Sequence, residues 1–233
     1  PLFADPGVNV QPIPSGTAGS TVTTTVTLSN SGSATVSFTP VVVVNGVTTT
    51  LAPVTLAPGQ TVSSAPISVP LTTSGATVTA SVTGASVPDA NLSNNSDTET
   101  SGALFADVST EVDLPANGVA GSTVSGTVVF TNSAAAGATA TAVTGTVSLS
   151  NGQVITYNVG TLTVGQSVTY TFTTTVPSTT GTVLEVTSTV ATATPETNTA
   201  NNQDVDNASG GEQLTPLFAD PGVNVQPIPS GTA

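Results

Sequence analysis

Apolar and polar residues alternate along most of this chain, and the alternation has a period of two. Residues 21–30 (TVTTTVTLSN) place Val22, Val26 and Leu28 among Thr and Ser, and residues 123–132 (TVSGTVVFTN) repeat the pattern. This alternation predicts strands with one buried face and one exposed face. Val and Thr occupy most of these positions, and both favour pleated strands because they branch at Cβ. No segment has the 3.6-residue apolar period of a helix.

Turn signals separate the predicted strands. Asn-Gly pairs stand between β-rich runs at residues 45–46 and 151–152, and turn clusters occur at residues 57–59 and 177–178. An Asn-Gly pair in this setting is a strong hairpin signal, because both central residues need positive φ. About seven short strands per 100 residues, with regular turns, predict an all-β fold of tandem immunoglobulin-like sandwiches.

The two ends of the chain carry the same sequence. Residues 1–18 recur without change as residues 216–233, an offset of 215. Such identity indicates a tandem duplication in the gene or an engineered overlap. The second copy contains only an opening strand, which cannot bury a face by itself. It is therefore predicted to begin another repeat or to dock into a neighbouring subunit. No signal peptide is visible at Pro1, so we expect an interior part of a longer exported protein.

A weaker repeat divides the chain into modules. Leu-Phe-Ala-Asp occurs at residues 2–5 and again 102 positions later, and matches further along have offsets of 106 and 107. The order of the matches is kept while the offset grows in small steps, as expected for homologous modules with short loop insertions. The sequence therefore predicts module 1 over residues 1–102, module 2 over 103–215, and the first strand of a third module over 216–233.

Several motifs follow one another in the same order in both modules. Ala-Gly-Ser-Thr precedes a strand that ends in Asn, an Ala-Pro-Gly-Gln-Thr turn occupies residues 57–61, and Pro-Asp-x-Asn-x-Ser-Asn-Asn occupies residues 88–95. Together they resemble bacterial surface repeats of the CARDB (cell-adhesion-related) type. The resemblance implies seven-stranded sandwiches in tandem on large secreted or surface-anchored proteins, and it implies no single ligand. Module 2 departs from the pattern, with Val-Gly-Gln at residues 164–166.

The composition removes most kinds of chemistry. The 233 residues include no Lys, Arg, His, Cys, Met or Trp, and the formal charge is −13. Nucleic acids and anionic membranes are bound through basic residues, so neither is an expected partner, and no apolar run is long enough for membrane insertion. Without His or Cys the usual ligands for zinc and haem are missing, and no His or Lys can activate a Ser. Glu185, the one acid inside a strand-like run, is predicted to face outward. We therefore expect no enzymatic activity.

Twelve of the 13 acidic residues lie at the predicted module ends, with no basic residue to neutralise them. Like charges at such density destabilise a compact junction unless a cation screens them. Calcium is the candidate cofactor, because it binds six to eight oxygens from carboxylates, Asn and the main chain. The candidate metal ligands are Asp5, Asp89, Asn91, Asn95, Asp97, Asp107, Glu196, Asn198, Asn202, Asp204, Asp206 and Asp220.

Two clusters of these residues are expected, one at each junction. The first is predicted to contain Asp89, Asn91, Asp97 and Asp107, and the second Glu196, Asn198, Asp204 and Asp220. The alternative is that the acids are solvated turn residues that keep a Val-rich protein soluble, with the Asn residues forming Asx-turns.

The predicted function is structural: an extracellular or cell-surface segment of a stalk, fibre or filament in a large surface or matrix protein, with copies of itself as partners. The alternative is an adhesin or binding module that recognises a carbohydrate or partner protein through its loops. Binding surfaces are usually rich in aromatic residues. Here Phe3, Phe105 and Phe218 recur at module starts, so they are predicted to pack at junctions.

Overall fold

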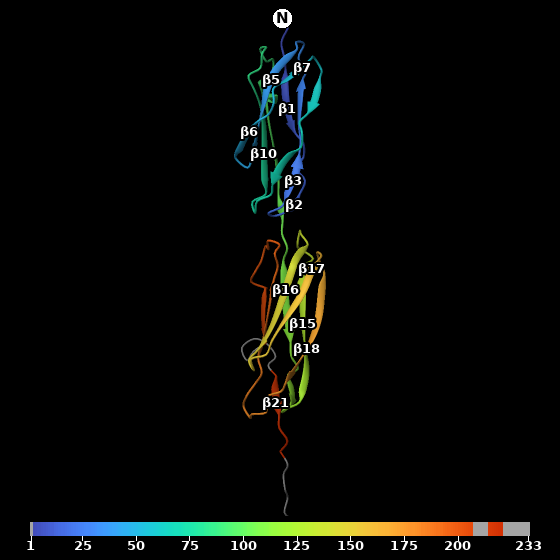
Figure 1. Ribbon diagram of the computed structural model, residues 1–233, viewed down its shortest axis with the longest axis vertical. Coiled ribbons are helices and arrows are strands. Elements are labelled where there is room, and N and C mark those ends of the chain that lie inside the picture. Colours follow the sequence, from blue (N-terminus) through green and yellow to red (C-terminus); the bar gives the residue numbers. More distant parts are fainter. Residues whose placement is uncertain (1, 207–213, 221–233) are drawn as a thin grey trace, which may run out of the picture.

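The computed structural model describes residues 2–206 and 214–220, which form two β-rich bodies stacked end to end (Figure 1). Buried apolar side chains gather in two clusters, one drawn from residues 4–80 and the other from residues 106–214. The expected all-β fold is confirmed, since the described residues contain strands and one 3₁₀ turn, η1 (Leu92–Asn94), but no α-helix. Within these ranges no helix has the length and apolar character needed to cross a membrane.

The strands of module 1 form two layers around the first cluster. One layer holds β1 (Pro6–Val10), β4 (Val26–Asn30) and β8 (Thr61–Ser63), with β3 (Thr21–Thr24) paired to β9 (Ile67–Pro70). The other layer has the order β11 (Ser96–Ser101), β10 (Ala76–Thr83), β5 (Val36–Val44), β6 (Val47–Thr50), and β7 (Val54–Leu56) also pairs with β5. Alternate residues of β5, such as Phe38 and Val42, are buried between the layers, as the period of two predicts.

Module 2 repeats this arrangement with strands of different lengths. One sheet has the order β13 (Val108–Asp113), β15 (Thr123–Asn132), β18 (Ser167–Thr175). The other has the order β17 (Val154–Leu162), β16 (Ala140–Leu149), β19 (Val186–Ala191), β20 (Gln203–Asp206). Phe130, on β15, is completely buried between the two sheets. These seven strands in two facing sheets are the architecture of an immunoglobulin-like sandwich.

Short parallel pairings mark the end at which the chain leaves each module. β12 (Ala103–Leu104) pairs with β2 (Gly16–Thr17), and β21 (Thr215–Leu217) pairs with β14 (Asn117–Val119). Residues 103 and 104, predicted to begin module 2, therefore pair with module 1. We call these ends the trailing ends, and the opposite end, where the chain enters, the leading end of each module.

The two Asn-Gly hairpins differ. At the first, Asn45 and Gly46 have φ of 47° and 84°, as predicted for a two-residue loop between Val44 and Val47. At the second, Gly152 has a φ of 89° but Asn151 does not have a positive φ, so that part of the prediction is wrong. The main chain of Leu149 bonds to Gln153, which leaves a three-residue loop. Such loops need positive φ only at their last residue.

Candidate functional site at the module ends

Carboxylates and amides interlock at the leading end of module 1. Asn94 donates its side-chain Nδ2 to Asp5 Oδ1 at 2.8 Å, and Asn95 donates Nδ2 to Asp89 Oδ2 at 2.8 Å. The other oxygen of Asp89 accepts the main-chain N–H of Asn91 at 2.9 Å. The main chain of Asp89 also pairs with Ala4. The loop before β11 is thereby tied to the segment that enters β1.

A similar network forms at the leading end of module 2. Asn201 donates Nδ2 to Asp107 Oδ1 at 3.0 Å, and Asn202 donates Nδ2 to Glu196 Oε1 at 3.1 Å. The second oxygen of Glu196 accepts the N–H of Val108 at 3.1 Å. Charged acceptors strengthen such bonds, so each module ties its own entering strand to its own last loop.

A second pair of carboxylates holds the first strand of each module. Asp97 Oδ2 accepts the N–H of Val10 at 2.7 Å, and Asp204 Oδ2 accepts the N–H of Val112 at 2.7 Å. Asp97 is on β11 and Val10 on β1, so the bond joins edge strands of opposite sheets. An edge strand has unpaired N–H groups, and here a carboxylate satisfies one of them.

Sequence reasoning missed the role of the Asn that ends the strand after Ala-Gly-Ser-Thr. Asn132 is fully buried and donates Nδ2 to the carbonyl oxygens of Ala138 and Leu162, both at 3.0 Å, while its Oδ1 accepts the N–H of Asp107 at 3.2 Å. Asn30 makes the matching bonds in module 1. The signal for this role was present, since Asn stands at equivalent positions of both modules.

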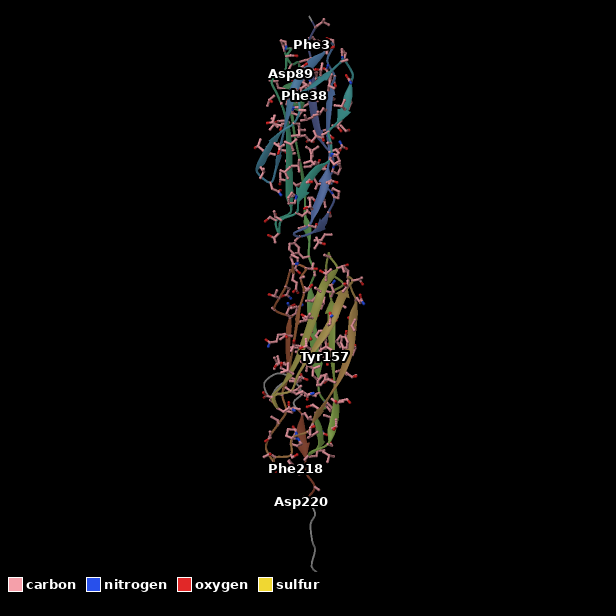
Figure 2. The ribbon with its side chains drawn as sticks, viewed as in Figure 1. Phe3, Phe38, Asp89, Tyr157, Phe218 and Asp220 are labelled. Atoms are coloured by element: carbon pink, nitrogen blue, oxygen red, sulfur yellow. The ribbon has the colours of Figure 1, made fainter. Side chains whose placement is uncertain are left out.

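The predicted grouping of candidate ligands is wrong. Asp107 lies with Glu196 in module 2, whereas Asp89 lies with Asp5 at the outer end of module 1. Figure 2 shows Asp220 beyond the trailing end of module 2, at the opposite end of that module from Glu196. The reason is topological, because the loop before the last strand returns to the end where the same module began.

The remaining candidates serve local structure. Asn91 Oδ1 accepts the N–H of Ser93 at 3.2 Å, and Asn198 Oδ1 accepts the N–H of Ala200 at 3.0 Å, as in Asx-turns. Asp204 and Asp206 line a shallow groove beside the acidic residues of β13. Glu185 lies just before β19 and is half-buried, so the expected fully outward position is only partly met.

The module ends do not fit calcium as they are arranged. Within residues 2–206 and 214–220, no group of three or more acidic side chains converges as a metal site would require. The amides of Asn94, Asn95, Asn201 and Asn202 turn their hydrogens toward the carboxylates, and their own Oδ1 atoms are buried without a hydrogen-bond partner. Calcium needs oxygens on all sides. Each amide would have to reverse before a cation could lie between it and its carboxylate.

The calcium site that the sequence suggests can be tested directly. Because amide hydrogens already occupy the carboxylates, we expect the same melting temperature in calcium and in a chelator. A ligand selective for the folded state would raise that temperature by mass action. If calcium instead raises the melting temperature, and the Asp5→Asn, Asp107→Asn double variant loses this rise, the amides turn and calcium binds.

The two modules differ on the side of the sandwich where an edge strand of one sheet faces an edge strand of the other, β17 and β18 in module 2. In module 2 the rings of Phe130, Tyr157 and Tyr170 fill this side, with the two tyrosine centroids 4.7 Å apart. Burial, and to a smaller extent the neighbouring Tyr170, raises the pKa of the Tyr157 hydroxyl. Leu51 stands where module 2 has Tyr157 and Ser64 where it has Tyr170, both at an offset of 106.

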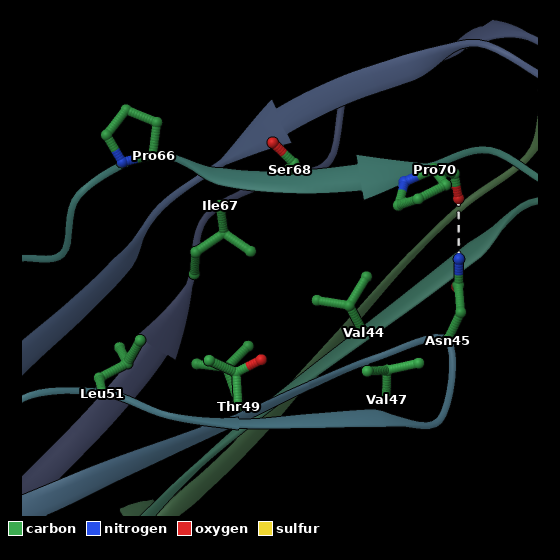
Figure 3. A pocket seen from close by; sticks show the side chains of 10 residues that line it. Val44, Asn45, Val47, Thr49, Leu51, Pro66, Ile67, Ser68 and Pro70 are labelled. Carbon is green, nitrogen blue, oxygen red and sulfur yellow. Dashed lines mark hydrogen bonds between the residues drawn. The ribbon is translucent and has the colours of Figure 1, made fainter.

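The smaller side chains leave a groove in module 1. A hollow of about 480 Å³ lies between β6 and β9, and Figure 3 shows Val44, Val47, Thr49 and Leu51 facing Ile67 across it. A second hollow, lined by Leu28 and Ser64 among others, continues it past Leu51. The lining is mostly apolar and carries no charged side chain.

A scan against protein-family models and a search of curated proteins found no match. Several solved structures are similar to this chain. A solution NMR structure of a CARDB domain from Pyrococcus furiosus is 17% identical, with a TM-score of 0.40, over 49% of this chain and 97% of the domain. A crystal structure of the same domain, in complex with di-metal ions, is 20% identical, with a TM-score of 0.37, over 43% of this chain and 96% of the domain.

A more distant similarity spans both modules. Red sea bream transglutaminase is 12% identical over 94% of this chain but only 31% of its own length, with a TM-score of 0.35. Each CARDB structure instead covers about half of this chain. The solved structures similar to this chain thus include the CARDB type that its sequence motifs resemble.

Proposed function

We propose that this chain is a structural segment of a tandem array, forming a stalk or fibre outside the cell. The observation that carries the proposal is that the chain leaves both modules in the same way. Leu104 O accepts the N–H of Ala18 at 2.8 Å beside the β12–β2 pair, and Leu217 O accepts the N–H of Ala120 at 3.0 Å beside the β21–β14 pair. An array needs such a recurring exit, because it passes the chain to each next module in one orientation.

The side chains beside these exits support the same role. At the internal junction Leu104 lies against Gly137 of module 2, and Phe105 is half-buried. Phe3 and Phe218, the copies of Phe105 at the outer ends, are 45% and 44% exposed. Large apolar side chains exposed at both ends of a molecule indicate contact surfaces. In an array, a neighbouring module would cover them further, as expected from the half-buried Phe105 at the internal junction.

The composition suits a passive role in an exposed environment. The chain has no Cys or Met, so the residues most readily oxidised are missing. The formal charge of −13 keeps a Val-rich β-protein soluble and opposes sideways aggregation. With no His, Lys or Cys available, we propose a non-catalytic role outside the cell or on its surface.

Imaging of the native material tests this proposal. We expect electron micrographs to show thin rows of β-bodies with a repeat of two modules. In boiling detergent, a covalent array should run as a chain much longer than 233 residues. A native protein that is a compact monomer, with residues 216–233 packed on its own modules, would contradict the structural role.

A binding role is the second candidate, and the groove of module 1 favours it. Its apolar lining suits the side chains of a protein partner more than a sugar, because sugar sites are usually built on exposed aromatic platforms. A glycan array tests whether the ligand is a carbohydrate rather than a protein. Binding of a glycan by the whole chain would favour the adhesin over the structural segment.

A further inference from the structure

The chain contains two identical strand segments, and module 1 holds a site for one of them. Residues 2–18 of the first copy occupy that site, which we call the first-strand site. Of the second copy, residues 216–233, only residues 216–220 are described. The contacts of the first copy therefore show what the second copy can bind, because every side chain is the same.

The first-strand site is a built acceptor for an extended segment. β1 pairs antiparallel with β4 at five positions, from Pro6 opposite Asn30 to Val10 opposite Val26, and within the described sheet β4 is its one strand neighbour. Val8, Val10 and Ile13 are buried in the core of module 1. Exchange of this edge segment breaks the β1–β4 pair, the short β2–β12 pair and the Ala4–Asp89 bridge, and the incoming copy can form each of them again.

Polar groups of the site recognise the main chain and one acidic side chain of the segment. Asp97 accepts the N–H of Val10, and Asn30 Oδ1 accepts the N–H of Asp5 at 3.2 Å. Asn94 donates to the Asp5 carboxylate at 2.8 Å. Asp220 is the copy of Asp5, so residues 216–233 can make each of these bonds.

The second copy starts from the right place to reach such a site in another molecule. β21 leaves module 2 as β12 leaves module 1, and the chain after β12 enters the equivalent site of module 2, where Asp204 accepts the N–H of Val112. The site in the same molecule lies beyond module 2 (Figure 1) and opens at the outer end of module 1, near Asp89 in Figure 2. Thirteen residues after Asp220 span at most about 45 Å, whereas the ten residues of β15 alone cover about 33 Å.

We infer that the first-strand site of module 1 accepts residues 216–233 from a second copy of the chain, which joins copies head to tail by strand addition. The inference deepens the proposed structural role, on which it rests. In such an assembly Leu-Phe-Ala-Asp leads from one copy to the next, as it leads from module 1 to module 2. Exchange replaces one strand by an identical one, so the site makes the same interactions before and after the exchange. The chain as it stands should therefore assemble weakly.

Weakening the chain's own first strand should favour binding of residues 216–233 from another copy. In the full chain, Val8→Asp with Val10→Asp places two charges in the core and disables residues 1–18, while residues 216–233 remain intact. We expect concentration-dependent polymers, seen as multiples of the monomer mass by analytical ultracentrifugation and as linear chains in micrographs. In boiling detergent they should fall to the mass of one chain, since no covalent bond forms.

Two matched variants decide the outcome. The chain with Val223→Asp and Val225→Asp should remain monomeric, because its own first strand is intact and its second copy is disabled. The chain with all four substitutions should also remain monomeric, with module 1 unfolded. A free peptide of residues 216–233 should stop growth of the polymers, and the peptide with both aspartates should not.

The inference is overturned if the Val8→Asp, Val10→Asp chain assembles no more than the chain with all four substitutions. Equal aggregation of the two would have the same meaning, because disordered module 1, rather than strand addition, would then cause it. Neither result bears on a covalent array, which the chain length of the native material tests separately.

Discussion

Replacing Asn132 by Leu is expected to lower the free energy of unfolding of module 2 by about 3–5 kcal/mol. Leu is apolar and cannot form the hydrogen bonds of the amide that it replaces. The loss comes from these bonds, since the carbonyl oxygens of Ala138 and Leu162 and the N–H of Asp107 all lose their bond to this side chain. Each buried polar group left without a partner costs about 1–3 kcal/mol.

Tyrosine fluorescence during denaturant unfolding measures this effect. Tyr157 and Tyr170 are the two tyrosines of the chain, so the signal reports on module 2 alone. Asn158→Leu is the matched control, because Asn158 is exposed on β17 and the chemical change is the same. The control should shift stability by less than about 0.5 kcal/mol. Equal unfolding midpoints for the two variants would show that Asn132 does not hold the sheets together.

Filling the groove of module 1 with residues taken from module 2 is expected to stabilise module 1 by about 1 kcal/mol. The changes are Thr49→Ile and Leu51→Tyr, which copy Ile155 and Tyr157 at an offset of 106. Both residues of module 2 pack against its core, whereas Thr49 and Leu51 line an open hollow. For a domain of this size, such a gain raises the melting temperature by about 4–8 °C.

Calorimetry of the full chain provides the measurement, with the transition of module 2 as an internal reference. The matched control is Thr48→Ile with Thr50→Ile, which adds apolar atoms to β6 at positions that alternate with those lining the groove. It should give no gain. A gain as large in the control would mean that β-propensity, not filling of the groove, stabilises the strand. Leu28 is left unchanged because it lies beside Pro40, while its counterpart Phe130 lies against Gly145.

Local pattern predicted much of the fold because strands and tight turns depend on neighbouring residues. The alternation in residues 21–30 and 123–132 indicates the buried faces of β4 and β15 correctly, and the Asn45-Gly46 turn has the predicted positive φ. The second Asn-Gly turn was not predicted correctly, because one extra residue in its loop changes which position needs positive φ. Repetition with small offsets likewise predicts two modules without any knowledge of contacts.

The candidate site depended on contacts that sequence distance hides. Asp5 meets Asn94 across 89 positions, and Asp97 meets Val10 across 87. The sequence alone predicts that the acids near residues 89–113 form one cluster at a junction. In the folded chain they separate, because one loop returns to the outer end of module 1 and the other acids begin module 2.

The sequence by itself determined that this protein is all-β, that it repeats, and that its acids gather near module ends, since these properties follow from composition and short-range periodicity. Only the tertiary structure decided which of these residues come together. It paired four carboxylates with side-chain amides of their own modules, gave Asn30 and Asn132 their buried bonds, and left module 1 hollow where module 2 stacks its tyrosines. The physical reason is that a hydrogen bond or a packed ring depends on the direction in which distant strands cross, and no local pattern specifies that direction.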